Sequence, residues 1–346
     1  MSDSFLSSLL SKQRFCLVTH VRPDGDAIGS QLAFGLFLTK LGKEVHMINS
    51  DPIPDNMGWL THVDRIEVFD GSIDQRERIN SVDAVVIMDA NARNRLGDIT
   101  PLIDNSAATK YLVDHHTNPE NWFDEVYLKD KASSTGELVY ELIDGAGKLE
   151  LIDADIASAL YAAIVTDTGS FKYSAVTPAL HHVVADILER GGIQPTPIHT
   201  AIYDTRSIGS LRLLSKALGT ITLKYDGQVG YMVISRRMLK ELQADSDETN
   251  GFVNYVLSIE GVKAGLIFLE TAKGTKVSFR STADIHVNGW AQFFGGGGHR
   301  NASGAFVKKP LEKTIELVMA AAPDFIDIDE SSVQVEDELT PEDFIR

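Results

Sequence analysis

Short apolar runs that end in an acidic or histidine side chain are the feature of this sequence that most restricts its fold. Four runs favour strands, at residues 15–19, 45–48, 84–88 and 111–113, and all but the second are followed directly by His or Asp. Stretches with apolar residues at helical spacing follow them, at 27–41, 135–143, 156–166 and 178–190. Continuous apolar strands alternating with helices are typical of a parallel sheet covered by helices on both faces. The sequence therefore predicts an α/β domain over residues 1–191.

The carboxyl ends of the predicted strands carry a recurring set of polar side chains. In sheets of this kind ligands bind beyond those ends. The set comprises His20, Asp24, Asp26, Asp89, the triplet Asp114-His115-His116, and Asp167 after the helical run 156–166. Carboxylates and imidazoles together hold divalent cations, and one carboxylate can bridge two of them. We therefore expect a two-metal hydrolytic site at this edge of the sheet.

Each of these residues, taken alone, also fits a structural role. Asp26 is well placed to cap the first long helix, with Asp24 in the preceding turn. Asp89 and Asp167 could cap a loop or form a turn, and two loop histidines can be satisfied by backbone groups. The repetition at one edge of one sheet favours a shared site.

The pattern changes after Gly191-Gly192, and Pro195 and Pro197 predict a connector there. Two hairpins follow, with turns at Asp226-Gly227 and Lys273-Gly274, so residues 192–322 are expected to form a smaller mixed α/β domain. Within it, the loop Gly295–Gly298 offers bare backbone N–H groups that can bind an anion, with His299 and Arg280 as further donors. A flexible linker loop is the alternative.

The charge of the chain restricts its partners. A net charge of −17 argues against nucleic-acid binding through a broad basic face, although bound cations can attract a phosphate substrate locally. Residues 323–346 are strongly acidic, which predicts a disordered tail, with partner docking as the alternative. Cys16 lies in an apolar run and is expected to be buried, and no run is long enough to span a bilayer. We therefore expect a cytoplasmic protein.

These motifs resemble those of the DHH phosphoesterase superfamily, in the same order along the chain. They are His20-x-x-x-Asp24-x-Asp26, Asp89, Asp114-His115-His116 and Thr166-Asp167-Thr168-Gly169. Phe279-Arg280-Ser281 and the stretch from Gly295 to Gly304 are similar to the substrate-binding signature of the DHH-associated C-terminal domain.

The resemblance implies a role for each motif residue. His20, Asp24 and Asp89 would hold one Mn²⁺, and Asp26, Asp89, His115 and Asp167 the second. His116 would contact the scissile phosphate or protonate the leaving group, and Asp114 would orient its neighbours. Substrate would bind in a cleft between the two domains, on Arg280, Ser281, Gly296, Gly297, Gly298 and His299.

The resemblance also implies a class of substrate. The two-domain layout is similar to the branch that contains oligoribonucleases (nanoRNases) and pAp phosphatases, whose substrates are short RNA oligonucleotides and small phosphorylated nucleotides. Hydrolysis of cyclic di-AMP or its linear product pApA is one alternative, and a non-catalytic nucleotide-binding protein is the other. A homodimer is compatible with all of these functions.

Overall fold

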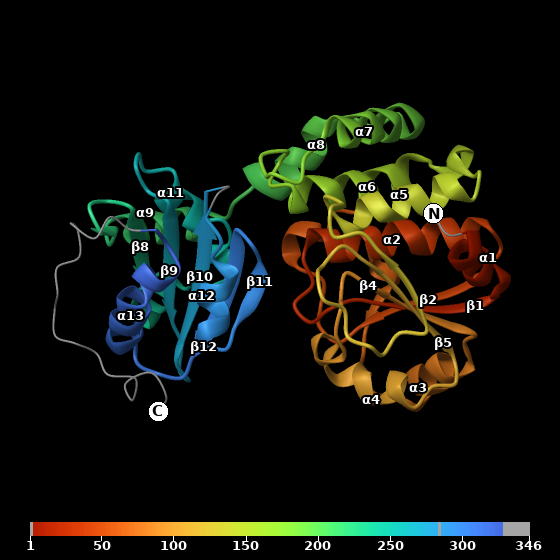
Figure 1. The fold of residues 1–346 in the computed structure, drawn as a ribbon, viewed down its shortest axis with the longest axis horizontal. Coiled ribbons are helices and arrows are strands. Elements are labelled where there is room, and N and C mark those ends of the chain that lie inside the picture. Colours follow the sequence, from red (N-terminus) through yellow and green to blue (C-terminus); the bar gives the residue numbers. More distant parts are fainter. Residues whose placement is uncertain (1–2, 283–284, 328–346) are drawn as a thin grey trace. The chain divides into compact units, whose positions relative to one another are not determined.

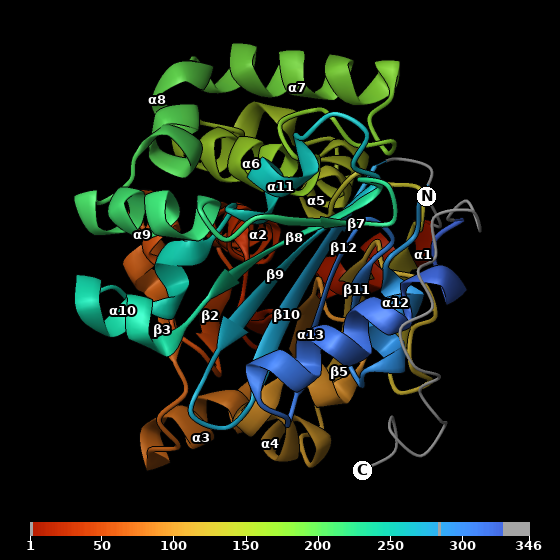
Figure 2. The same ribbon diagram turned by 90° about the vertical axis from the view of Figure 1, so that its left-hand side faces the viewer.

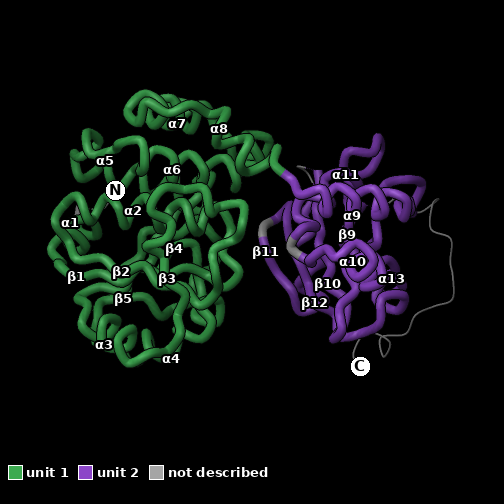
Figure 3. Tube along the Cα trace, turned by 180° about the vertical axis from the view of Figure 1, so that it is seen from behind, with its two compact units in different colours: residues 1–205 green, residues 206–346 purple. Residues whose placement is uncertain are grey.

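The computed structural model describes residues 3–282 and 285–327. The chain forms two compact units, residues 1–205 and 206–346 (Figure 3). The division therefore lies after Thr205, and the boundary predicted near residue 192 is too early. Pro195 begins a short helix, α8 (Pro195–His199), which is a position that proline favours. Ile198 and Ile202 pack into the core of the first unit, so this segment belongs to it.

The first unit is built on a six-stranded parallel sheet with the order β3-β2-β1-β4-β5-β6. The strands are β1 (Arg14–Val18), β2 (Glu44–Asn49), β3 (Ile66–Val68), β4 (Ala84–Met88), β5 (Thr109–Asp114) and β6 (Glu125–Leu128). The predicted parallel sheet is confirmed. The two edge strands, β3 and β6, were not predicted from the sequence.

Helices cover both faces of this sheet, as expected (Figures 1 and 2). Successive residues of β1 alternate between two cores, with Phe15 and Leu17 in one and Cys16 in the other. The larger core lies under α1 (Asp3–Ser11), α2 (Gly25–Lys40), α5 (Thr135–Gly145) and α6 (Ala154–Asp167), with α7 (Pro178–Gly191) packed on α6. On the opposite face lie α3 (Ile73–Ser81) and α4 (Thr100–Asp104). The strands are continuous apolar runs in the sequence because both faces of the sheet are buried.

Small residues bring α2, α5 and α6 into close contact. A Cβ atom on Gly29 would lie 2.5 Å from the carbonyl oxygen of Ala159 on α6. A Cβ atom on Gly136 of α5 would lie 2.5 Å from the Cβ of Ala163. These three helices can therefore approach only because glycine occupies both positions, and the first turns of α2 and α5 meet the last turn of α6.

The second unit contains a six-stranded mixed sheet with the order β11-β12-β10-β9-β8-β7. Its strands are β7 (Thr222–Lys224), β8 (Val229–Ile234), β9 (Ala264–Glu270), β10 (Thr275–Ser281), β11 (Gly297–His299) and β12 (Ala302–Val307). Only β8 and β9 pair in parallel, and both predicted hairpins, β7–β8 and β9–β10, are present. One face packs on α12 (Asn288–Phe293) and α13 (Leu311–Ala320), the other on α9 (Ile208–Leu218), α10 (Arg236–Leu242) and α11 (Val253–Leu257).

The polyglycine segment differs from the predicted loop, because Gly297–His299 form β11 at the edge of this sheet. A Cβ atom on Gly296 would lie 2.1 Å from the carbonyl oxygen of Gly304, and one on Gly298 would lie 2.6 Å from that of Ala302. Glycine at these positions lets β11 lie against β12. A Cβ atom on Gly297 would meet no atom within 4 Å.

The C-terminal end of the second unit also differs from the prediction. The acidic tail was expected to start at residue 323, but Ile326 is buried and Phe325 stacks on Trp290. Two apolar side chains within an acidic stretch thus belong to the core. The rest of the predicted tail, residues 328–346, lies outside the described residues. Every described helix is too short or too polar to cross a membrane.

Candidate metal centre

The metal-binding residues predicted from the sequence converge at the carboxyl edge of the first sheet. Ligand atoms fall into three groups, in each of which all atoms lie within 4.8 Å of one another. The groups are His20, Asp24 and Asp89; Asp26, His115 and Asp167; and Asp89, Asp114, His115 and His116. The first group is the set predicted for one cation, and the second holds the residues predicted for the other except Asp89. The third group shares Asp89 with the first and His115 with the second.

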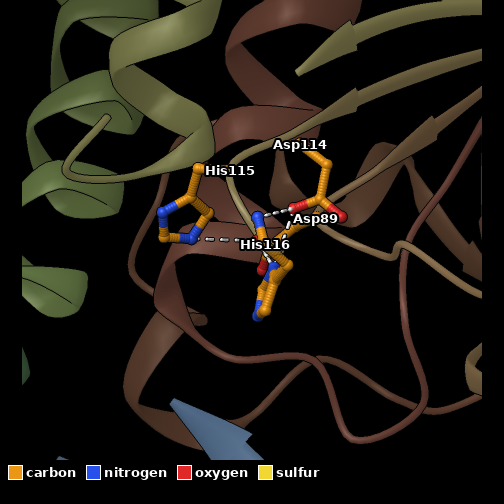
Figure 4. Close-up of side chains that lie close together, drawn as sticks. All are labelled: Asp89, Asp114, His115 and His116. Atoms are coloured by element: carbon orange, nitrogen blue, oxygen red, sulfur yellow. Dashed lines mark hydrogen bonds and ion pairs between the residues drawn. The ribbon is translucent and has the colours of Figure 1, made fainter. Parts of the chain in front are cut away.

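Asp89 faces histidines of both predicted ligand sets, and Figure 4 shows it beside His115 and His116. Its Oδ2 is 3.4 Å from Nε2 of His20, and its Oδ1 is 3.6 Å from Nε2 of His115. The two oxygens of one buried carboxylate thus face different histidines, which is the arrangement of a bridging ligand. Asp89 follows β4 with a φ of 57°, a left-handed conformation that an Asp residue tolerates better than most. Backbone strain of this kind is found at functional sites.

Asp26 is held by the start of α5. Its Oδ2 accepts a hydrogen bond from the backbone N–H of Thr135 (2.7 Å), and its Oδ1 accepts one from Gly136 (2.9 Å). A helix N-terminus stabilises a carboxylate in this way. The helix cap that the sequence suggested for Asp26 is instead provided by Asp24, whose Oδ1 accepts from the N–H groups of Asp26 and Ala27.

Thr135 is a site residue that the sequence reasoning missed. Its hydroxyl donates to Oδ1 of Asp89 (3.0 Å), so one residue orients both Asp26 and Asp89. The sequence did carry a signal for the helix start, because Ser134 is an N-cap residue whose hydroxyl accepts the N–H of Glu137, and the Glu137 carboxylate in turn accepts the N–H of Ser133. It carried no signal that this helix start would point at Asp26, since that depends on the packing of α5 against α2.

Two histidines have their ring orientation fixed by backbone carbonyls. The Nδ1–H of His20 donates to the carbonyl of Val21 (2.9 Å), and the Nδ1–H of His115 donates to that of Ala132 (3.2 Å). Because a carbonyl only accepts, the neutral form of each ring carries its proton on Nδ1 and leaves Nε2 to face the carboxylates. Nε2 of His115 is 3.3 Å from Oδ2 of Asp167 and 3.8 Å from Oδ2 of Asp26. Both rings therefore present the atom that binds metal ions.

His116 is held differently, by a carboxylate. Its Nδ1 is 2.7 Å from Oδ1 of the fully buried Asp114, which also accepts the backbone N–H of His116 (Figure 4). Burial alone would lower the pKa of His116, but the hydrogen bond to Asp114 and the charge of Asp89 raise it to about 9. His116 is therefore protonated at neutral pH in the metal-free protein and can act as a proton donor.

The carboxylates of the site repel one another in the absence of cations. Burial raises the pKa of Asp167 to about 7, and Asp24 and Asp89 add to the shift. Burial, Asp89 and Asp167 likewise raise the pKa of Asp26 well above its usual range. Burial also acts to raise the pKa of Asp89, but the hydrogen bond from His20 and the neighbouring histidines lower it overall. Crowded, buried carboxylates beside imidazole Nε2 atoms are a donor set that fits divalent cations.

In the second unit, the predicted substrate-binding residues lie on β10 and β11. Arg280 and His299 are both paired with Ala302 of β12, so they occupy aligned positions across three neighbouring strands. Ser281 is buried; its hydroxyl donates to the carbonyl of Ile285 and accepts from Nδ2 of Asn301 (3.0 Å). Ser281 and Asn301 thus attach Ile285 to the end of β10. Substrate binding by these residues stays a prediction, as does a cleft shared by the two domains.

Comparison with known families agrees with this geometry. Residues 14–164 match the family described as "DHH family, N-terminal domain", and residues 226–326 match the DHHA1 domain. The protein belongs to the DHH family. The matched segments contain His20 to His116 of the site and both strands that carry Arg280 and His299.

Individual relatives extend over most of the chain. The bifunctional oligoribonuclease and PAP phosphatase NrnA of Thermus thermophilus is 29% identical and aligns over 88% of each chain. The cyclic-di-AMP phosphodiesterase PdeA of Listeria monocytogenes is 25% identical over 86% of this chain and 45% of its own length. The solved structure of an exopolyphosphatase-related protein from Bacteroides fragilis covers 94% of this chain, and this chain covers 98% of it, with a TM-score of 0.88 and 28% identity.

Proposed function

We propose that this DHH-family protein is a metal-dependent phosphoesterase that hydrolyses short oligoribonucleotides, with pAp as a second substrate. The observation that carries the proposal is the position of Asp89, whose two oxygens face His20 and His115 in separate ligand groups. The name of the Thermus relative supports the choice of substrate.

The donor set supports Mn²⁺ as the metal. Each ligand group combines carboxylate oxygens with an imidazole nitrogen, which suits Mn²⁺ better than Mg²⁺, an ion that prefers oxygen and retains water. When bound, two such cations activate water and neutralise charge on the phosphoryl group. Asp26, held by the start of α5, and Asp89, held by Thr135, keep the ligand oxygens in place before any ion binds.

His116 is proposed to give its proton to the leaving oxygen. Its ring is fixed through Nδ1 by Asp114, so its Nε2–H is the group that can reach a substrate. Asp114 is a positioning residue, because it touches His116 and is itself fully buried. Arg280, His299 and the glycines of β11 are proposed to bind the substrate from the second unit. A cytoplasmic location and a homodimer stay predictions.

The test is a substrate panel with matched variants. The purified protein is incubated with Mn²⁺ and RNAs of two to five nucleotides, pAp, pApA and cyclic di-AMP, and the products are resolved. We expect mononucleotides from the short RNAs. Asp89→Asn should abolish turnover. Asp83→Asn is the control and should retain it, since Asp83 lies just before the first residue of β4, at the other end of the strand from Asp89, and pairs with Arg14. Turnover by Asp89→Asn, or no turnover of any substrate by the wild type, would exclude the proposal.

Hydrolysis of cyclic di-AMP or pApA is the second candidate, favoured by the similarity to the Listeria phosphodiesterase. The same panel separates the two functions through the ratio of kcat/KM for pApA and cyclic di-AMP to that for short RNAs. A non-catalytic protein would bind Mn²⁺ and nucleotide without product.

A further inference from the structure

Arg95 lies beside the metal centre and was not identified from the sequence. It ends the 3₁₀ turn Arg93–Arg95, and its backbone carbonyl accepts the N–H of Val21 (2.7 Å), the neighbour of His20. The next residue, Leu96, is fully buried and its carbonyl accepts the hydroxyl of Ser50 (2.6 Å). The turn is therefore attached to the loop that carries His20, and the backbone position of Arg95 does not depend on its side chain.

The charge of Arg95 acts on both sides of the site. Its guanidinium opposes protonation of His20, a predicted ligand of one cation, and also of His116, the proposed proton donor. Arg95 thus lies within electrostatic range of both histidines, on a turn whose backbone is bonded to the residue that follows His20.

The half-buried side chain of Arg95 makes no hydrogen bond or ion pair with any described residue. Its neighbour Arg93 is fully engaged, with Glu120 at 2.6 Å, Asp104 at 3.9 Å and the Trp122 ring beneath its guanidinium. Partial burial of an arginine without a partner is unfavourable, and this chain carries a net charge of −17. No described carboxylate neutralises the charge of Arg95, whereas an anionic ligand at the metal centre would.

We propose that Arg95 binds the non-bridging oxygens of the phosphoryl group that is hydrolysed. This inference rests on the proposed function. A planar guanidinium matches two phosphate oxygens at once, and it stabilises charge that develops on them. During hydrolysis a water oxygen bonds to phosphorus and the ester P–O bond breaks. The leaving oxygen takes a proton from His116, the water releases one proton to solvent, and His116 regains a proton from solvent. Arg95 exchanges no proton and acts only through binding.

The test compares Arg95→Ala and Arg95→Lys with Arg93→Ala as the matched control. With Mn²⁺ and a dinucleotide, kcat/KM of Arg95→Ala should fall about 100-fold, the usual effect of losing one donor to a developing oxyanion. Arg95→Lys should retain part of the activity, and millimolar guanidinium should restore part of it to Arg95→Ala. Arg93→Ala should stay within about threefold of wild type, since surface ion pairs contribute little. Metal content and Tm are measured for every variant.

Several outcomes would overturn this role. Activity of Arg95→Ala within threefold of wild type, with the metals in place, would do so. A shift in the pH dependence of the rate of Arg95→Ala, without a lower maximal rate, would also do so. Arg95 would then act only on the charge of His116. Binding of orthophosphate to the Mn²⁺-loaded protein, measured by calorimetry, tests the inference without turnover. We expect at least about tenfold weaker binding by Arg95→Ala. Equal binding by wild type and Arg95→Ala, or no binding by wild type, would refute the inference. This result does not depend on whether the protein hydrolyses oligoribonucleotides.

Discussion

Asp167→Asn should stabilise the metal-free protein and weaken its metal binding. In the absence of cations the pKa of Asp167 is raised to about 7, and its side chain is only 15% exposed. The shift is about three pKa units, and each unit corresponds to about 1.4 kcal/mol, so the ionised carboxylate destabilises the metal-free fold by up to about 4 kcal/mol. Asn removes this charge but also the attraction to His115. We therefore expect a net gain of about 2 kcal/mol in the free energy of unfolding at pH 8.

The sign of the pH dependence follows from the same shift. Between the unfolded pKa and a pH of about 7 the native protein holds the extra proton, so its stability decreases as the pH rises. The gain from Asp167→Asn should therefore be largest at pH 8, about half as large at pH 5.5, and absent below the unfolded pKa.

Thermal unfolding of the full chain, followed by circular dichroism, measures this effect. For a unit of this size 2 kcal/mol corresponds to an increase in Tm of about 4–8 °C in EDTA. With Mn²⁺ the order should reverse, because the variant lacks a ligand. A variant that is no more stable than wild type in EDTA at pH 8, or a gain that does not depend on pH, would refute the reasoning.

Three further predictions concern the fold and the second unit. Burial raises the pKa of the Cys16 thiol to about 12, so a thiol reagent at pH 8 should modify it only after unfolding; rapid labelling of the native protein would contradict the burial. Gly298→Ala should lower Tm, because its Cβ would lie 2.6 Å from the carbonyl of Ala302, whereas Gly297→Ala should leave Tm unchanged; equal Tm values would contradict the packing of β11. Deletion of residues 328–346 should leave Tm and dinucleotide turnover nearly unchanged. Deletion from Asp324 onward should lower Tm, because it removes Phe325 and Ile326 from the core. Equal effects of the two deletions on Tm would place the end of the domain elsewhere.

The central elements of the fold could be predicted because burial on both faces leaves a clear pattern. β4 (Ala84–Met88) was predicted with its bounds, since all five of its residues are buried and apolar. β3 (Ile66–Val68) and β6 (Glu125–Leu128) were not, because edge strands are short and partly exposed. β11 was predicted as a loop, because glycine carries no strand preference and the strand exists through close contact with β12.

The site could be predicted as a set of residues but not as a geometry. All eight side chains expected at the sheet edge are brought together in the structure. The sequence could not show that Asp24 caps α2 while Asp26 turns toward α5, because that depends on how the two helices pack. Thr135 and Arg95 were not predicted as site residues, because each is brought to the site by a tertiary hydrogen bond of its backbone.

The number of Mn²⁺ ions bound per chain is the most direct test of a two-metal site bridged by Asp89. It can be measured by equilibrium dialysis and elemental analysis of wild type, His20→Ala and Asp89→Asn, with Tm as the check on folding. The structure predicts two ions for wild type, one for His20→Ala, and fewer than one for Asp89→Asn, because that residue faces both ligand groups. Two ions retained by folded Asp89→Asn, or fewer than two bound by wild type, would contradict the account.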